Sequence, residues 1–483
     1  MKPIKYKVAA AIRSYVLPTV ALASFLFGAS SVLSSHAKSL PITREYQAYT
    51  LDTGKQTNNT ANEVVAFKSV IKAANDPSKV RVHFSSFDFG RASYLTLTSV
   101  RDGGRQKLDV TSMGYWQNTS AIFNGDEILL ELHVAPGEQG IYAQVDQLIN
   151  ECNCSGEALN VSAAQLARTL CGSDSRIASG DNRVGRISGC TAWLVSNGAV
   201  LSAGHCGPIS GVFEANVPAS SSSGVTVASA PEDQYPIDTS NTTSVDNGQG
   251  DDYSVFGLLP NSTTGSRAHQ RFGFFRMTRE LPGAGDTIRI TGFGVDNTPA
   301  GPVANCCARN SSGTCTHANC NAQSRTLQTS TGDYVGETVT AASDIHHSYQ
   351  TDTEPANSGS PIIWNTASYT IGIHTHGGCS SGGGANAGTS FENNNLEILL
   401  QGFLGSNTKY VDLTQPPNSP TENGTIFQPF NTVTEAVSSV VDGGRIAIVE
   451  GSYTKAAGNT MIMGAGGKSF TVLAPVGTVT IGN

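Results

Sequence analysis

Short runs of alternating or β-branched apolar residues recur along most of the chain. Between residues 38 and 150 they include VRVHFSSFDF, YLTLTSV, EILLELHV and IYAQVDQLI, and turn-forming residues separate them. A period of two is typical of a strand that has one face in a core. The pattern predicts a mainly β protein that begins, after residue 37, with a β-sandwich over 38–150.

Two further patterns appear downstream. In GCTAWLVSNGAVLSAGHC, residues 189–206, two apolar strands flank Asn197 and Gly198, which is the strongest short-range signal for a hairpin. In FENNNLEILLQGFLG, residues 391–405, leucines and phenylalanines recur at helical spacing and predict an amphipathic helix.

The last part of the chain changes character. Prolines and turn formers predict a linker over 405–424. Residues 425–483 then predict one helix and short strands at 445–449, 470–474 and 478–481. Such a short tail has three interpretations: it is marginal alone, it docks on the preceding domain, or it pairs with another surface.

The start of the chain predicts export. Lys2, Lys5, Lys7 and Arg13 precede an apolar stretch, and Ser-His-Ala follows at 35–37. This order is typical of a signal peptide, assigned to 1–37, whereas an uncleaved membrane anchor is the alternative because the apolar stretch is long. We therefore expect a secreted protein, either extracellular or periplasmic and cell-surface, without a stable membrane span once the signal is removed.

The net charge and the cysteine content limit the kinds of partner and the cellular compartment that we expect. The formal net charge of -8 argues against a nucleic-acid partner. Ten cysteines on an exported chain favour disulfides. A small zinc site is the alternative for the crowded Cys306, Cys307, Cys315 and Cys320, with His317 nearby. The pairing of that cluster with Cys152, Cys154, Cys171 and Cys379 stays open.

Three fragments carry candidate chemistry, in the order histidine, aspartate, serine. SAGHC contains His205, GDDYSVF contains Asp252, and TDTEPANSGSP contains Ser358. A serine hydroxyl is a weak nucleophile unless an imidazole accepts its proton and a carboxylate orients that imidazole. The neighbouring Asp251 is interpreted as a solvated loop carboxylate.

With these fragments, residues 171–404 resemble the chymotrypsin-like serine endopeptidases. The resemblance implies a double β-barrel, peptide substrates, no cofactor and no metal. It also implies that Ser358 attacks the peptide carbonyl, that His205 is the general base and that Asp252 orients it.

The same resemblance implies two structural features near the nucleophile. A disulfide joins Cys190 to Cys206, and the backbone N–H groups of Ala356 and Ser358 form the oxyanion hole. The family usually has glycine where this chain has Ala356, and an added methyl group disfavours some backbone conformations.

The segment TIGIHTHGG, residues 370–378, resembles the bacterial glutamyl endopeptidases. The resemblance implies that His374 and Thr353 line a pocket for an acidic side chain, so cleavage after Glu or Asp is the hypothesis. A structural role for His374 is the alternative. Those enzymes also place a free N-terminal amine near the pocket, whereas this chain continues through Cys171.

The flanking parts carry weaker resemblances. HFSSFDF and WQNTSAIFNGD resemble CUB-like modules, and the tail resembles the first coils of right-handed parallel β-helix proteins. The N-terminal module is interpreted as a propeptide, as a targeting or carbohydrate-binding module, or as a spacer. Residues 151–170 are predicted to be a linker or processing region, with Arg168 and Arg176 as candidate cut sites in a zymogen.

Two functions compete at this point. The first is a secreted serine endopeptidase that forms an acyl-enzyme. The alternative is a catalytically silent binding or adhesion protein, in which a protease fold is the scaffold and the flanking β modules bind a surface glycan or a protein.

Overall fold

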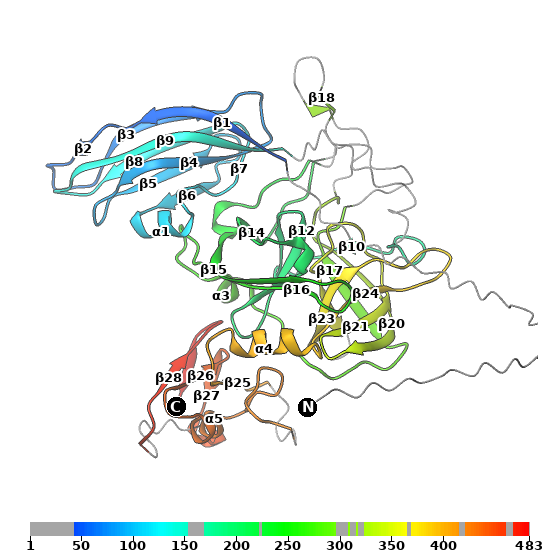
Figure 1. The fold of residues 1–483 in the computed structure, drawn as a ribbon. Helices are drawn as coiled ribbons and strands as arrows, with labels where there is room; N and C mark the ends of the chain where they lie inside the picture. Colours follow the sequence, from blue (N-terminus) through cyan, green and yellow to red (C-terminus); the bar gives the residue numbers. More distant parts are fainter. Residues whose placement is uncertain are drawn as a thin grey trace, which may run out of the picture. The chain divides into compact units, whose positions relative to one another are not determined.

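Two antiparallel sheets enclose one hydrophobic core in the N-terminal region (Figure 1). One sheet has the spatial order β1 (Thr43–Asp52), β9 (Gln139–Cys152), β4 (Lys79–Asp88) and β7 (Phe123–Asn124), with β2 (Gln56–Thr57) paired to β9. The other has the order β3 (Val64–Lys72), β8 (Glu127–Val134), β5 (Tyr94–Ser99) and β6 (Arg105–Leu108). This arrangement confirms the predicted β-sandwich.

The alternation of residues in β8 explains why this strand forms. Ile128, Leu130 and Leu132 are fully buried, while the residues between them are partly exposed. A short helix, α1 (Val110–Tyr115), follows β6, and the carboxylate of Asp109 caps its first turn.

The structure is a computed structural model, and it describes residues 43–152, 169–221, 225–295, 308–309, 315–316, 323–364, 369–414, 421–459 and 467–482. Several predictions fall outside these residues: the signal peptide over 1–37, Arg168, Cys154, and Cys306, Cys307, His317 and Cys320. Of the cysteine-rich segment, β18 (Ala308–Arg309) and β19 (Cys315–Thr316) are described and pair with each other. In the described part of the chain, no helix combines the length and the apolar character needed to cross a membrane.

The central region contains two six-stranded barrels. The first closes in the order β11 (Val184–Ile187), β12 (Cys190–Leu194), β13 (Val200–Ser202), β16 (Asp252–Leu258), β15 (Gln234–Asp246) and β14 (Val212–Glu214). The second closes in the order β20 (Gln328–Ala341), β17 (Thr287–Gly292), β22 (Pro361–Trp364), β23 (Tyr369–His376), β24 (Asn386–Ser390) and β21 (Asp344–Gln350). The short β10 (Ile177–Ala178) pairs with β20. The predicted double β-barrel is confirmed.

The hairpin predicted around Asn197 and Gly198 joins β12 to β13. Leu194 pairs with Val200, and Gly198 has a φ of 85°, a conformation that glycine adopts without steric cost. Trp193, on β12, is fully buried in the core of the barrels. Three short helical segments complete this region: η1 (Gly204–Cys206), η2 (Pro231–Asp233) and α3 (Ala268–Phe272).

The predicted amphipathic helix is α4 (Asn394–Gly402), which buries Leu396 and Leu400. The predicted linker that follows it differs from the structure, because Thr408–Val411 forms strand β25 and pairs in parallel with β26 (Gly444–Ile448). Burial explains the difference, since Tyr410 packs in the same core as Leu396 and Leu400. A strand of four residues just before a proline-rich stretch carries too little pattern to be recognised locally.

The C-terminal strands are parallel, as the tail's resemblance implied. β26 also pairs with β28 (Phe470–Leu473), and β27 (Gly451–Tyr453) pairs with β29 (Val479–Ile481). Helix α5 (Val433–Ser439) begins with a capping box from Thr432 to Glu435, and η3 (Lys455–Ala457) lies after β27. Arg276 binds the carboxylate of Asp412 at 2.7 and 3.1 Å, so the tail contacts the barrel region through charge as well as apolar packing.

Candidate active site

Strand pairing in the first barrel brings His205 and Asp252 together. β13 and β16 are antiparallel, with Ser202 opposite Ser254. His205 lies in the turn η1 just beyond the end of β13, while Asp252 is the first residue of β16. In an antiparallel pair these two ends coincide, so residues 47 positions apart in sequence become neighbours.

The carboxylate of Asp252 is fully buried and holds the histidine turn by three hydrogen bonds. Oδ1 accepts the N–H groups of Gly204 at 2.6 Å and of His205 at 3.0 Å. Oδ2 lies 2.6 Å from Nδ1 of His205. A carboxylate at Nδ1 favours the tautomer that leaves Nε2 as a proton acceptor.

Gly204 makes this turn possible. A Cβ atom at this position would lie 1.7 Å from the carbonyl oxygen of Val245, so no larger residue fits without movement of the backbone.

Ser358 comes from the second barrel and packs against the first. It lies in the loop between β21 and β22, and its carbonyl oxygen accepts the N–H of Thr191 on β12 at 2.9 Å. Sγ of Cys206 is 3.9 Å from the same oxygen. The loop that contains Ser358 therefore lies against Cys206, the residue that follows His205.

The Cys190–Cys206 disulfide is present, beneath the histidine turn, as the resemblance implied. A second disulfide joins Cys171 to Cys379, a pairing that the sequence left open. Asp251 differs from its interpretation as a solvated carboxylate. It is buried and accepts hydrogen bonds from the side chains of Asn247 and Asn393.

Ala356 has a φ of 78°, in the left-handed region that disfavours residues with a Cβ atom. Its carbonyl oxygen accepts the hydroxyl of Thr191 at 3.0 Å, and the N–H of Asn357 donates to the carbonyl of Glu354 at 3.0 Å. The methyl group noted in the sequence is thus accommodated, and the backbone adopts a conformation typical of glycine.

Comparison with known proteins agrees with this geometry. The family model described as Trypsin matches residues 174–395. This region is a trypsin-like serine protease domain. The chain is accordingly a serine endopeptidase, whose substrates are proteins or peptides.

Solved structures are also similar to part of the chain. One described as a Glu endopeptidase in complex with MPD has 17% identity and a TM-score of 0.32, covering 47% of this chain and 95% of its own. One described as the thermostable serine protease AL20 from an extremophilic microorganism has 15% identity and a TM-score of 0.30, covering 44% of this chain and 92% of its own. No curated protein matches the chain.

Within the protease domain, His374 lies on β23 with its ring fully buried. The hydroxyl of Tyr349 is 2.6 Å from Nδ1. Burial, together with the neighbouring His376 and His205, lowers the pKa of His374 to about 3. Burial also raises the pKa of Tyr349 well above its ordinary value, so the phenol keeps its proton.

These shifts determine the tautomer of His374. Tyr349 donates to Nδ1, which leaves the proton of the neutral ring on Nε2. Within the described part of the chain, this buried Nε2 has no partner with good hydrogen-bond geometry, and the carbonyl of Ala387 is an acceptor that favours the protonated form of the ring. The ring thus presents a hydrogen-bond donor without a formal positive charge.

Thr353 is connected to the same region through Asn386, on β24. The amide nitrogen of Asn386 donates to Thr353 Oγ1 at 3.2 Å and to the carbonyl oxygens of Thr169 and Thr351, both at 2.8 Å. Its amide oxygen accepts the N–H groups of Gly378 and Cys379. The fully buried side chain of Asn386 therefore connects β24 to three other segments, which contain Thr169, Thr351 with Thr353, and Gly378 with Cys379.

A second buried side chain anchors the leading segment of the protease domain, residues 169–176. Oδ1 of Asp352 accepts the N–H of Cys171 at 2.7 Å, and Oδ2 accepts both the N–H and the hydroxyl of Ser175. Arg176 follows, and its guanidinium binds Asp174 and the carbonyl oxygen of Val295 while its side chain stays 3% exposed. This burial argues against Arg176 as an accessible cut site.

Sequence reasoning missed Tyr349, Asn386 and Asp352. Tyr349 and Asn386 are single polar residues on strands, without a motif around them. Asp352 lies inside the fragment TDTEPANSGSP, six positions before Ser358, but nothing in that fragment marked it.

Proposed function

We propose that the chain is a secreted serine endopeptidase that uses His205, Asp252 and Ser358 as a catalytic triad and prefers Glu or Asp before the cleaved bond. One observation carries the triad: the buried carboxylate of Asp252 binds His205 at both its backbone and its ring, next to the loop that contains Ser358.

In this mechanism, Oγ of Ser358 attacks the peptide carbonyl carbon as its proton passes to Nε2 of His205. The C–N bond then breaks, and the same proton passes to the leaving amine, which leaves an acyl-enzyme. Water repeats the sequence and releases the acid. The N–H groups of Ala356 and Ser358 are proposed to stabilise the oxyanion, and the positive φ of Ala356 supports this assignment.

The proposed preference for an acidic residue rests on His374 and Thr353. Nε2–H of His374 is a buried donor suited to a carboxylate, and a hydrogen bond to an ionised acceptor is stronger than a neutral one. Cleavage of a peptide library is expected to favour Glu over Leu, Phe and Arg, and the His374→Ala variant is expected to lose that preference while still forming an acyl-enzyme.

A fluorophosphonate probe tests the triad directly. We expect the full chain to be labelled, the Ser358→Ala variant to be unlabelled, and kcat of that variant to fall by about 10⁶-fold. Ser360→Ala is the matched control, since Ser360 is a buried serine in the same loop and is expected to leave labelling intact. Undiminished hydrolysis by a clean Ser358→Ala preparation would refute the assignment, and an unlabelled native chain would favour the silent binding protein.

Secretion is part of the proposal. The predicted signal over 1–37 and the two disulfides within the described residues are consistent with an oxidising compartment. We retain four flanking regions as proposed divisions of the chain: 38–150, 151–170, 405–424 and 425–483. Strand β25 lies inside the region 405–424.

A further inference from the structure

The N-terminal β-sandwich packs directly on the first barrel. The side-chain amide of Gln234 exchanges two hydrogen bonds with the backbone of Ile122, both at 2.8 Å. Asn124 makes a similar pair with the backbone of Ala228, at 2.8 and 3.0 Å. Val212, a barrel residue, belongs to the hydrophobic core of the sandwich. These contacts bury the interface between the β-sandwich and the first barrel.

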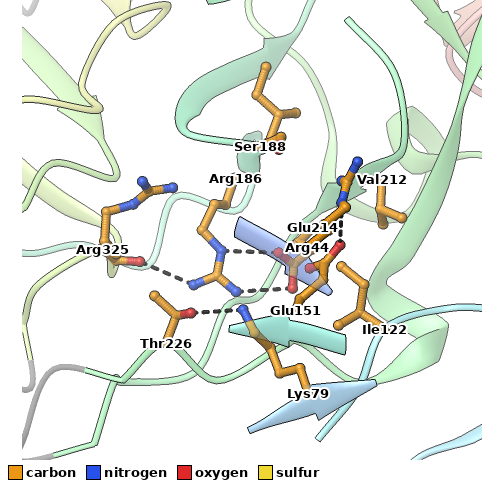
Figure 2. A pocket seen from close by; sticks show the side chains of 11 residues that line it. Arg44, Lys79, Ile122, Glu151, Arg186, Ser188, Val212, Glu214, Thr226 and Arg325 are labelled. Atoms are coloured by element: carbon orange, nitrogen blue, oxygen red, sulfur yellow. Dashed lines mark hydrogen bonds and ion pairs between the residues drawn. The ribbon is translucent and has the colours of Figure 1, made fainter. Parts of the chain in front are cut away.

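A cavity of about 20 Å³ lies in this interior and is lined by charged side chains from both sides. Arg44, Lys79 and Glu151 come from the sandwich, whereas Arg186, Glu214 and Arg325 come from the protease domain (Figure 2). A cavity of this size has room for one water molecule or one atomic ion. It is too small for a sulfate or phosphate ion, each of which has five heavy atoms.

The two carboxylates are already paired. Glu214 binds the guanidinium of Arg186 at two points, both 3.0 Å long. Glu151 accepts a hydrogen bond from Arg44 at 3.1 Å. Each pair is neutral as a unit, so neither carboxylate compensates a further cation in full.

Lys79 and Arg325 are the remaining cations. Nζ of Lys79 donates to a neutral oxygen, the hydroxyl of Thr226, at 2.9 Å. Nε of Arg325 is buried without a hydrogen-bond partner among the described residues. Lys79 is 3% exposed and Arg325 is 7% exposed, so bulk solvent screens neither charge well.

Lys79 and Arg325 both carry a positive charge at neutral pH. Burial and the nearby Arg186 lower the pKa of Lys79 to about 8, while Glu151 and Glu214 oppose this shift. Burial lowers the pKa of Arg325 to about 9. Both values lie above 7, so both groups stay protonated. The lining residues then carry four positive charges against the two carboxylates, and a small anion beside Lys79 offsets part of this excess.

We propose that this cavity binds one halide ion, chloride under physiological conditions, which pairs with Lys79 and stabilises the β-sandwich on the protease domain. The site is separate from the triad and does not depend on the proposed catalytic residues.

Thermal unfolding of the full chain tests this proposal. At neutral pH and constant ionic strength, replacing sodium gluconate by sodium chloride or bromide is expected to raise the unfolding midpoint by about 2–4 °C with saturation, because a ligand that binds only the folded state stabilises it. Gluconate is too large for the cavity. The Lys79→Met variant is expected to lose this halide dependence, whereas Lys68→Met, which changes an exposed lysine of the same sandwich, is expected to retain it.

A crystal grown or soaked in bromide provides a second measurement that needs no variant. An anomalous peak in the cavity beside Lys79 is the expected result. Equal midpoints in gluconate and halide, or a water molecule in the cavity with no bromide peak, would overturn the proposal even if Lys79→Met failed to fold.

Discussion

Asp252 binds His205 at two points: its Oδ1 accepts the backbone N–H of His205 at 3.0 Å, and its Oδ2 lies 2.6 Å from the ring nitrogen Nδ1. The carboxylate therefore sets the position of the residue and the orientation of its ring together. A ring held at one point only would retain rotational freedom about its side-chain bonds.

The two contacts between Asp252 and His205 predict that Asp252→Asn lowers kcat strongly. The amide is expected to present the wrong group to Nδ1, to disfavour the tautomer with a basic Nε2, and to lower kcat by about 10⁴-fold. The measurement is hydrolysis of a peptide substrate at neutral pH. Asp251→Asn is the matched control, since Asp251 binds Asn247 and Asn393, and it is expected to change kcat only a few-fold. Equal losses in both variants would contradict the assignment.

The left-handed backbone at Ala356 predicts opposite effects for two substitutions. Ala356→Gly is expected to be at least as stable and as reactive as the native protein, because glycine adopts φ of 78° without steric cost. Ala356→Val is expected to lose more than about 1 kcal/mol of stability, since a β-branched residue is strained there. Denaturant unfolding and the rate of fluorophosphonate labelling measure both. A glycine variant with much slower labelling would show that the methyl group itself is required.

Asn386 is predicted to position the specificity pocket without taking part in the chemistry. Asn386→Ala removes the bonds to Thr169, Thr351 and Thr353 and leaves buried carbonyl groups unsatisfied, so KM for a Glu substrate is expected to rise about tenfold or more while kcat changes less. Asn395→Ala, at an exposed position of α4, is the control. Equal changes in kcat for Glu and Leu substrates, with constant KM, would argue for a general loss of structure instead.

The pKa of about 3 for His374 predicts that selectivity does not depend on pH near neutrality. A neutral ring donates through Nε2 at every pH from about 6 to 9, and a Glu substrate is ionised throughout that range. The ratio of kcat/KM for Glu and Leu substrates is therefore expected to stay constant, because titration of His205 cancels in the ratio. A tenfold fall in the ratio per pH unit would instead mean that His374 binds substrate as a cation.

Buried histidines also predict the direction of acid sensitivity. Burial lowers the pKa of His347 to about 4, and its ring bonds to Tyr334 and to the carbonyl of Ile371. Between pH 6.5 and about 4 the unfolded chain binds a proton that the folded protein does not, so stability is lost as pH falls through this window.

His347→Gln tests the acid sensitivity. Removing this group is expected to reduce the loss in unfolding free energy between about pH 7.5 and pH 5 by about 2 kcal/mol. Urea unfolding at the two pH values measures it. An unchanged difference would mean that other groups dominate the acid response.

The sequence by itself determined the chemical groups of the candidate site. His205, Asp252 and Ser358 stand in short motifs, and the Asn197-Gly198 hairpin and helix α4 follow from local patterns, because turn preference and apolar periodicity act over a few residues. The double β-barrel followed from family resemblance carried by the same motifs.

Only the tertiary structure decided which distant groups meet. Asn386 bonds to a residue 217 positions away, Asp352 anchors Cys171 across 181 positions, and Lys79 meets Thr226 across 147. Strand β25 became recognisable only through its pairing with β26. Such partners depend on barrel closure and on packing between regions, and each polar residue alone has the same local sequence signal whether it is buried or exposed. Proximity in the folded structure, which a local pattern does not encode, makes Asn386 the centre of a hydrogen-bonded cluster, Asp352 an anchor and Lys79 part of a charged cavity.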